Sequence, residues 1–346
     1  MTTTKNLNRR AMLRGAGLAA VAAPALVGKG IAQGKVTWRV QSHWPKASAS
    51  FDDSLGVLTN WVTEKTDGAF KFELFGAGEF AKGPEIYNIV RKGVVAMGTA
   101  SPSYFQEKAQ AASFLYGIPG TLRESWEVQY MAKLGGVEAM VNEELNPDGI
   151  MLRSDKAYPT EIVLSKKIEN ADDFAGLKIR SSGTMLDYLQ AAGAAPSYIA
   201  GSELYQSLSS GVVDGAHWGA AIGAKSMSLW EVCKYHYKPA LGFTTDSFIY
   251  NLSEFEKLEP EMQEVLETAF NVRFYERSSE YQLGEAQALA AGVAENGVEV
   301  VQLPDDVLQV LAEASSKILE AEAAKGEIAA RAADVYRSLM KDLGYA

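Results

Sequence analysis

Arg180 is the residue whose type and position point most directly to ligand chemistry. It ends a short predicted strand, Lys178–Arg180, and so stands where a side chain can reach into a cleft. A guanidinium group binds a carboxylate through two parallel hydrogen bonds. We therefore expect Arg180 to hold the acid group of a ligand. The alternative is a surface arginine in a salt bridge.

Trp218 and His217 end a second predicted strand, which runs from Val212 to Trp218. The indole of Trp218 can form a pocket wall while its ring nitrogen donates a hydrogen bond. The alternative is a core tryptophan, because most tryptophans are largely buried for packing. His217 can donate a hydrogen bond to an anionic ligand or pack within its domain, and the sequence leaves both open.

Further candidates follow other strands. His43 and Trp44 come after the first predicted strand, at the end where α/β folds bind ligands. On similar grounds we add Tyr104, Phe243 and Asp246. Ordinary loop packing is an equal alternative for each of them. An aromatic lining with one strong cation suits a monoanionic acid better than a dicarboxylate or a sugar acid.

The sequence carries no signature of catalysis or of a metal centre. It has no G-x-S-x-G or H-E-x-x-H pattern and no glycine loop suited to a phosphate. One cysteine, Cys233, and three histidines are too few at their spacings for a dedicated zinc site. We expect a binding protein without metal or cofactor, and not an enzyme.

Composition and charge narrow the class further. The chain has 346 residues, of which 47% are hydrophobic and 22% charged, which is typical of a globular protein of two domains. The net charge of −10 is spread evenly, without the Lys/Arg cluster of a nucleic-acid binder. We therefore exclude nucleic acid as a partner.

Residues 1–32 have the layout of an export signal. Arg9 and Arg10 precede an apolar, alanine-rich run from Ala16 to Val27, and we expect cleavage after Ala32. Paired arginines before a weakly hydrophobic run are typical of a twin-arginine leader. The alternative of a membrane anchor needs a longer apolar run. The sequence therefore predicts a periplasmic protein.

Alternating strands and helices must position the candidate residues. In the first half we predict strands at residues 36–40, 70–74 and 94–100, a helix from Ser50 to Gly68, and a short helix after Pro84. Such alternation predicts a largely parallel sheet covered by helices, because parallel strands need crossover connections. The first half is therefore α/β.

A second α/β set follows. Its predicted elements are strands at residues 160–164, 178–180, 196–199 and 212–218, and helices capped by Thr184 and Ser202. The chain returns to strand at residues 248–251 before a long helix from Pro260 to about Gly292, a strand at 298–301 and a helix from Asp305. No flexible linker separates the two sets, so crossing strands must join them.

Four segments resemble a known family, the substrate-binding proteins of TRAP (tripartite ATP-independent periplasmic) transporters, or DctP family. Residues 172–180, Asp-Asp-Phe-Ala-Gly-Leu-Lys-Ile-Arg, are similar to the family's D-L-K-G-L-K-I-R segment. Residues 201–215 resemble its E-Y-x-A-L-Q-x-G-x-V-D-G segment, and residues 85–97 its V-x-x-G-x-x-x-M-G cadence. Residues 235–239, Tyr-His-Tyr-Lys-Pro, resemble the 2-oxo-acid-binding branch.

The resemblance implies a two-lobed periplasmic binding protein with a long bracing helix and a cleft that closes on ligand. The implied lobes are residues 35–157 with 245–283, and residues 158–244 with 284–346. The implied partners are a small organic acid and the membrane permease subunits of a TRAP transporter, and we expect a monomer. The alternative is a binding protein of an ABC importer or a sensor, for a zwitterionic or amine-containing ligand.

By the same resemblance Arg180 matches the family's principal acid clamp and Trp218 a ligand contact. His217 stands where many 2-oxo-acid binders carry a glutamate that helps to hold sodium. Hard cations prefer oxygen ligands, so we expect no metal here. Tyr158 to Glu161 replace a glutamine or arginine that contacts ligand or cation in relatives. Glu161 is expected to bind a ligand amine or hydroxyl or, preferably, to pair with Arg180.

Overall fold

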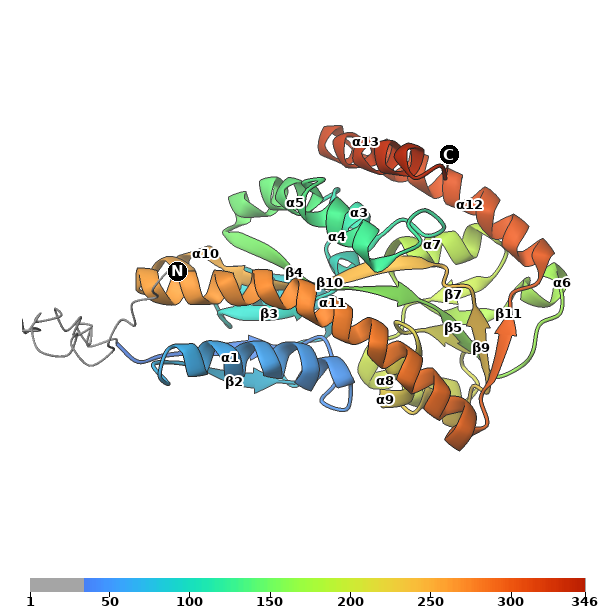
Figure 1. The fold of residues 1–346 in the computed structure, drawn as a ribbon, viewed down its shortest axis with the longest axis horizontal. Helices are drawn as coiled ribbons and strands as arrows, with labels where there is room; N and C mark the ends of the chain where they lie inside the picture. Colours follow the sequence, from blue (N-terminus) through green and yellow to red (C-terminus); the bar gives the residue numbers. More distant parts are fainter. Residues whose placement is uncertain (1–33, 346) are drawn as a thin grey trace, which may run out of the picture. The chain divides into compact units, whose positions relative to one another are not determined.

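The computed structural model describes residues 34–345, which form two β-sheets covered by helices (Figure 1). The predicted export signal, residues 1–32, lies outside the described residues. The two sheets and the long helix confirm the predicted α/β class and two-lobed architecture. We call each sheet with its covering helices a lobe.

The first sheet is mixed, with the strand order β2-β1-β3-β10-β4. Its strands are β1 (Val36–Gln41), β2 (Phe70–Phe75), β3 (Met97–Ala100), β4 (Ile150–Thr160) and β10 (Gly242–Asn251). β1 lies parallel to β2 and β3, as crossover helices require, whereas β10 runs antiparallel to both β3 and β4. The parallel part is the one that the sequence predicted.

The second sheet has the order β11-β9-β5-β8-β6-β7. Its strands are β5 (Ile162–Leu164), β6 (Lys178–Arg180), β7 (Ala195–Ser197), β8 (Gly215–His217), β9 (Tyr235–Lys238) and β11 (Glu299–Gln302). β6 lies parallel to β7 and β8, while β5 runs antiparallel to β8 and β9. The ends of β6 and β8 therefore place Arg180 and His217 side by side.

Two strand pairs connect the lobes. β4 ends at Thr160 in the first sheet and β5 begins at Ile162 in the second, so Glu161 lies at the crossing. The chain returns from β9 to β10 through residues 239–241. This confirms that crossing strands join the lobes; the exact lobe boundaries stay a prediction.

The helices pack on the outer faces of the sheets. They are α1 (Val57–Lys65), α2 (Ile86–Arg91), α3 (Ala112–Tyr116), α4 (Ser125–Lys133), α5 (Val137–Leu145), α6 (Ala171–Phe174), α7 (Gly183–Ala191), α8 (Gly201–Ser209), α9 (Ala221–Ser226), α10 (Leu252–Glu256), α11 (Pro260–Asn296), α12 (Asp305–Ala323) and α13 (Glu327–Asp342). Shorter helical turns lie at Phe51–Gly56, Gly83–Glu85, Pro102–Tyr104, Asn146–Asp148 and Leu229–Glu231. Among the described residues, no helix combines the length and apolarity needed to cross a membrane.

Helix α11 is the 37-residue brace predicted from Pro260 onward. It packs on β4 of the first lobe and on α9 of the second, and Figure 1 shows it running along both. The buried Ser278 accepts a hydrogen bond from the backbone N–H of Ala157 in β4. Farther along α11, the carboxylate of Glu285 accepts the backbone N–H groups of Ala221 and Ile222 in α9. One helix therefore fastens both lobes.

The predicted helix caps were wrong in detail. Ser50, where the first helix was predicted to begin, is itself in a helical conformation and its side chain makes no capping bond to the π-helical turn from Phe51. Thr184 lies inside α7, where its hydroxyl donates to the backbone oxygen of Gly117 in the other lobe. The helix predicted to begin at Ser202 is preceded by Ala200, which has no side-chain acceptor.

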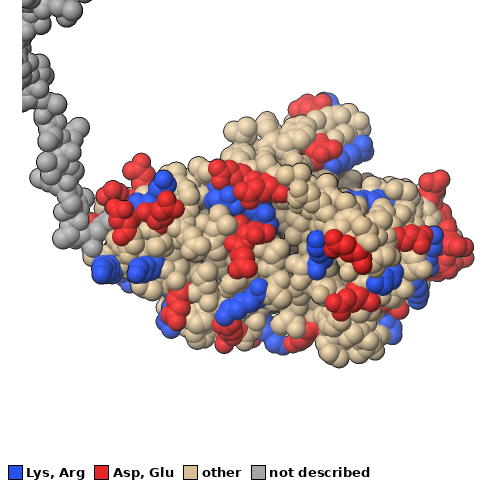
Figure 2. Space-filling model, turned by 60° about the horizontal axis from the view of Figure 1, so that its bottom comes forward, with Lys and Arg blue, Asp and Glu red and all other residues tan. Residues whose placement is uncertain are grey.

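Surface charge agrees with the composition. Acidic and basic side chains are interspersed over the face shown in Figure 2, with no large area of one sign. That distribution lacks the basic stripe by which a protein follows a phosphate backbone.

Candidate functional site

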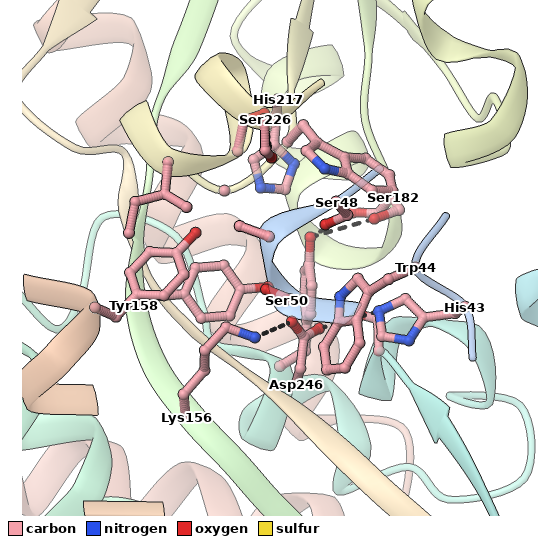
Figure 3. Close-up of a pocket in the computed structure, with 18 of the residues that line it drawn as sticks. His43, Trp44, Ser48, Ser50, Lys156, Tyr158, Ser182, His217, Ser226 and Asp246 are labelled. Atoms are coloured by element: carbon pink, nitrogen blue, oxygen red, sulfur yellow. Dashed lines mark hydrogen bonds and ion pairs between the residues drawn. The ribbon is translucent and has the colours of Figure 1, made fainter. Parts of the chain in front are cut away.

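A small cavity, of about 50 Å³, lies between the ends of the two sheets (Figure 3). Eight of the ten residues singled out in the sequence line it: His43, Trp44, Tyr104, Tyr158, Arg180, His217, Trp218 and Asp246. They come from both lobes, so the cavity is the space that the lobes enclose. The two others, Glu161 and Phe243, line a different cavity behind the crossing strands.

Arg180 is almost completely buried, with 2% of its surface exposed, at the end of β6. Its Nε donates to the oxygen of Ile199 at 2.9 Å, and its Nη1 donates to the oxygen of His217 at 2.7 Å. Among the described residues no carboxylate forms an ion pair with it. Both protein acceptors are neutral carbonyls, so the positive charge of Arg180 is uncompensated at the cavity wall.

Trp218 forms a platform for this guanidinium. Its ring centroid lies 4.6 Å from Cζ of Arg180, a distance suited to a cation–π contact. Two glycines make room for the indole. A Cβ at Gly201 would come within 2.3 Å of the ring, and one at Gly223 within 1.9 Å of the Trp218 backbone oxygen. Side chains at either position would displace the platform.

His217 is buried beside Arg180 and is held neutral. Burial, reinforced by the neighbouring Arg180 charge, lowers the pKa of His217 to about 3. Its Nδ1 lies 3.4 Å from Oγ of Ser181, which is a long contact. His217 therefore adds no second positive charge near Arg180 at physiological pH.

The first lobe contributes an ion pair that the sequence analysis missed. Lys156, which is 1% exposed, lines the cavity and donates to Asp155 and Asp246, in each case over 2.9 Å. Its Nζ also lies 4.5 Å from the ring centroid of Trp44. Asp246 contacts His43 on its other side, with 3.5 Å between Oδ1 and Nε2. Two carboxylates face one ammonium in this cluster, so this wall keeps negative charge.

Four tyrosines line the cavity: Tyr104, Tyr116, Tyr158 and Tyr281. Burial raises the pKa of each of these phenols, to about 12 for Tyr116. They remain neutral, and hydroxyls in this state can donate hydrogen bonds to an anion. The hydroxyl of Tyr116 donates to the backbone oxygen of Ser182 in the other lobe at 3.2 Å.

The predicted pairing of Glu161 with Arg180 was wrong. The carboxylate of Glu161 is buried and binds His236 and Lys238, both in β9 of the second lobe. Nδ1 of His236 receives the indole N–H of Trp230, so its Nε2 carries the hydrogen that is donated to Glu161. Glu161 lies at the strand crossing, next to β9, so Lys238 of that strand forms the ion pair that we had predicted for Arg180.

The cavity has few side chains that could bind a metal cation. Within residues 34–345, no group of three or more His, Cys, Asp and Glu side chains is arranged to hold a metal ion. The lining offers one carboxylate, Asp246, which Lys156 already engages.

Comparisons with known proteins agree with this architecture. The family model for the bacterial extracellular solute-binding proteins, family 7, matches residues 42–325. A monocarboxylate 2-oxoacid-binding periplasmic protein of Nostoc is 27% identical over 297 residues, which is 84% of this chain and 80% of that protein.

Solved structures show the same fold. A TRAP periplasmic solute-binding protein from Pseudoalteromonas atlantica, with bound sodium and pyruvate, has a TM-score of 0.82 at 22% identity, covering 90% of this chain and 95% of that one. An extracytoplasmic solute receptor from Bordetella pertussis that binds pyroglutamic acid has a TM-score of 0.80 at 19% identity, covering 87% and 99%.

Proposed function

The chain belongs to the bacterial extracellular solute-binding proteins, family 7, and on that premise we propose that it captures a small monocarboxylate in the periplasm and delivers it to a TRAP membrane permease. The acid is held by Arg180 between the two lobes. Binding involves no bond making or breaking. Relatives that carry pyruvate or pyroglutamic acid support a small organic acid as the ligand.

The observation that carries this proposal is the uncompensated charge of Arg180. A buried cation without an anionic partner is costly, because burial removes its hydration. A ligand carboxylate would supply the missing charge. Nη2 makes no hydrogen bond to any described residue and, with the second hydrogen of Nη1, can donate to two carboxylate oxygens.

The other cation of the cavity favours one carboxylate over two. Lys156 already binds two aspartates, so a second ligand carboxylate would meet a wall that carries compensating negative charge. Most of the remaining lining is aromatic or hydroxylic. A small acid with a single negative charge fits this distribution better than a dicarboxylate.

Isothermal titration calorimetry of the mature protein, residues 33–346, against monocarboxylates, dicarboxylates, amino acids, amines and polyols tests the proposal. We expect a monocarboxylate to bind and Arg180→Ala to weaken it by roughly 10- to 100-fold, since hydrogen bonds to charged groups contribute about 1.5–3 kcal/mol. Arg180→Lys should recover only part of the loss, because an ammonium lacks the planar fork.

Arg153→Ala is the matched control. Arg153 lies in the first sheet, pairs with Glu267 through Nε at 2.7 Å and does not line the cavity, so its loss should leave affinity unchanged. Unaltered binding by Arg180→Ala would refute the clamp. If only amines or neutral polyols bind, the ligand is not an organic acid, and the alternative class of ligand is favoured.

A further inference from the structure

A β-bulge shapes the first-lobe wall of the cavity. Ala157 of β4 pairs with Thr245 of β10, but Ser154 pairs with Ser247. Two residues, Asp155 and Lys156, therefore stand opposite the single residue Asp246. A bulge interrupts the usual alternation of side chains and re-aims them, which is why bulges are frequent next to binding sites. Here it brings three charged side chains into contact.

Within this cluster Lys156 binds both aspartates. Its ammonium donates to one aspartate on each side, and the rings of Trp44, Tyr158 and Tyr281 surround it at 4.5, 4.9 and 5.6 Å from their centroids. An ammonium has three hydrogens, and two are already used. Lys156 therefore serves mainly to hold Asp246 in place.

Asp246, by contrast, keeps an acceptor free for the cavity. Oδ2 receives the Lys156 ammonium, Nε2 of His43 lies 3.5 Å from Oδ1, longer than a normal hydrogen bond, and the hydroxyl of Tyr158 is a further neighbour of the carboxylate. A carboxylate has about four lone-pair sites, so these partners leave it able to accept another hydrogen. Figure 3 shows Asp246 between Lys156 and His43. Burial alone would raise the pKa of Asp246, but Lys156 and His43 hold it below its usual value. Asp246 therefore stays an anion.

The cavity thus carries opposite charges on its two walls, Arg180 from the second lobe and Asp246 from the first. Building on the proposed function, we propose that the ligand is a carboxylate that also bears a hydrogen-bond donor, a hydroxyl or an N–H, which Asp246 accepts. Arg180 binds the acid end of the molecule and Asp246 the donor end. The bulge makes Asp246 the residue that determines specificity.

This arrangement disfavours a simple 2-oxo acid. Its keto oxygen would face the anionic oxygen of Asp246. Neither oxygen carries a hydrogen to donate, so both would be left without a partner, which costs binding energy. A bridging cation could join the two oxygens, but the only carboxylate of the lining already binds Lys156. A 2-hydroxy acid of the same carbon skeleton presents the O–H that is needed.

Matched ligand pairs on the unmodified protein test the inference. Lactate is compared with pyruvate, and 2-hydroxy-3-methylbutanoate with 3-methyl-2-oxobutanoate, by calorimetry in chelator-treated buffer and again with added sodium and calcium chloride. We expect the hydroxy acid to bind roughly tenfold or more tightly in at least one pair, since an unpaired acceptor typically loses that much. Equal affinity, or a preference for the oxo acid under either condition, would overturn the inference.

Two variants assign the selectivity to Asp246. Asp246→Asn replaces the anionic acceptor by an amide that can also donate, so the preference for the hydroxy acid should shrink to about threefold or less. Asp155→Asn is the control, because Asp155 binds the same ammonium at the same distance but does not line the cavity. It should retain the preference. If both variants lose the preference equally, Asp246 acts only through Lys156 and the assignment is wrong.

These outcomes separate the two proposals. If no carboxylate binds, the proposed function fails. If carboxylates bind through Arg180 but hydroxy and oxo acids are not distinguished, the proposed function stands and only the role of Asp246 fails.

Discussion

At the scale of single residues, the two buried cations of the cavity behave differently because their partners differ. Arg180 is surrounded by carbonyl oxygens and aromatic rings, which leave its charge uncompensated. Lys156 is bound by two carboxylates. A buried cation with only neutral neighbours still lacks a compensating negative charge, which a ligand can supply. A cation that is paired with protein carboxylates already has one. This contrast makes Arg180 the better candidate for the ligand contact.

The glycine beneath the Trp218 ring leads to a prediction about Arg180. Gly201→Ala places a methyl group within 2.3 Å of the indole, so the ring must move and the guanidinium loses its platform. We expect monocarboxylate affinity to fall about fivefold, corresponding to a cation–π contribution of about 1 kcal/mol. Calorimetry measures the change. Ser202→Ala, an adjacent change outside the cavity lining, should bind normally, and an unaffected Gly201→Ala would show that the platform is dispensable.

Lys156 shows what the sequence could not reveal about the site. In a regular strand, adjacent residues point to opposite faces, so Asp155 and Lys156 would be separated. Only pairing with β10, some 90 residues away, creates the bulge that turns both toward Asp246. Arg180 and Trp218 could be predicted because each stands at the end of a strand with a recognisable sequence. Long-range register has no comparable local signal.

At the scale of elements, the strand crossing explains the error at Glu161. We predicted that Glu161 lies near Arg180 because both were assigned to strands of the second lobe. In the structure β5 pairs with β9, which supplies His236 and Lys238 as partners. Elements with strong periodicity, such as β1, β2 and α11, could be predicted directly. The short helices α3, α4 and α5 were missed because glycine and proline interrupt the pattern between them.

The contact between α11 and α9 predicts a pH-dependent stability. Burial, with a contribution from Glu161, raises the pKa of Glu285 to about 7 from an ordinary 4.5. Between these values the folded state binds more protons than the unfolded chain, so stability falls as pH rises through this window. The destabilisation caused by Glu285→Gln should therefore shrink between pH 5 and pH 8, by up to about 3 kcal/mol.

Urea unfolding at pH 5 and pH 8 measures this change. Glu280→Gln on the same helix is the control. Hydrogen bonding to Arg273 lowers the pKa of Glu280, so its carboxyl is ionised at both pH values and the cost of its replacement should be constant. If the cost of Glu285→Gln is also constant, Glu285 titrates normally and the α11–α9 contact does not sense pH.

At the scale of the whole molecule, side chains of the two lobes meet around the cavity. Tyr116 of the first lobe donates to Ser182 of the second. At the rim Lys82 pairs with Glu203 over 2.7 Å, and the rings of Tyr104 and Tyr198 meet edge to face at 5.9 Å. These contacts require the two lobes to lie against each other, as they do in this structure.

Closure without ligand would leave the charge of Arg180 buried and unpaired, so the empty protein should populate a more open form. We expect the radius of gyration, measured by small-angle X-ray scattering, to decrease when a saturating monocarboxylate is added. Arg180→Ala should show no decrease at the same ligand concentration. It should also be the more compact of the two empty proteins, because removing the guanidinium removes the penalty for closing. An empty Arg180→Ala protein as open as the empty unmodified protein would mean that lobe geometry, and not the buried charge, sets the open state.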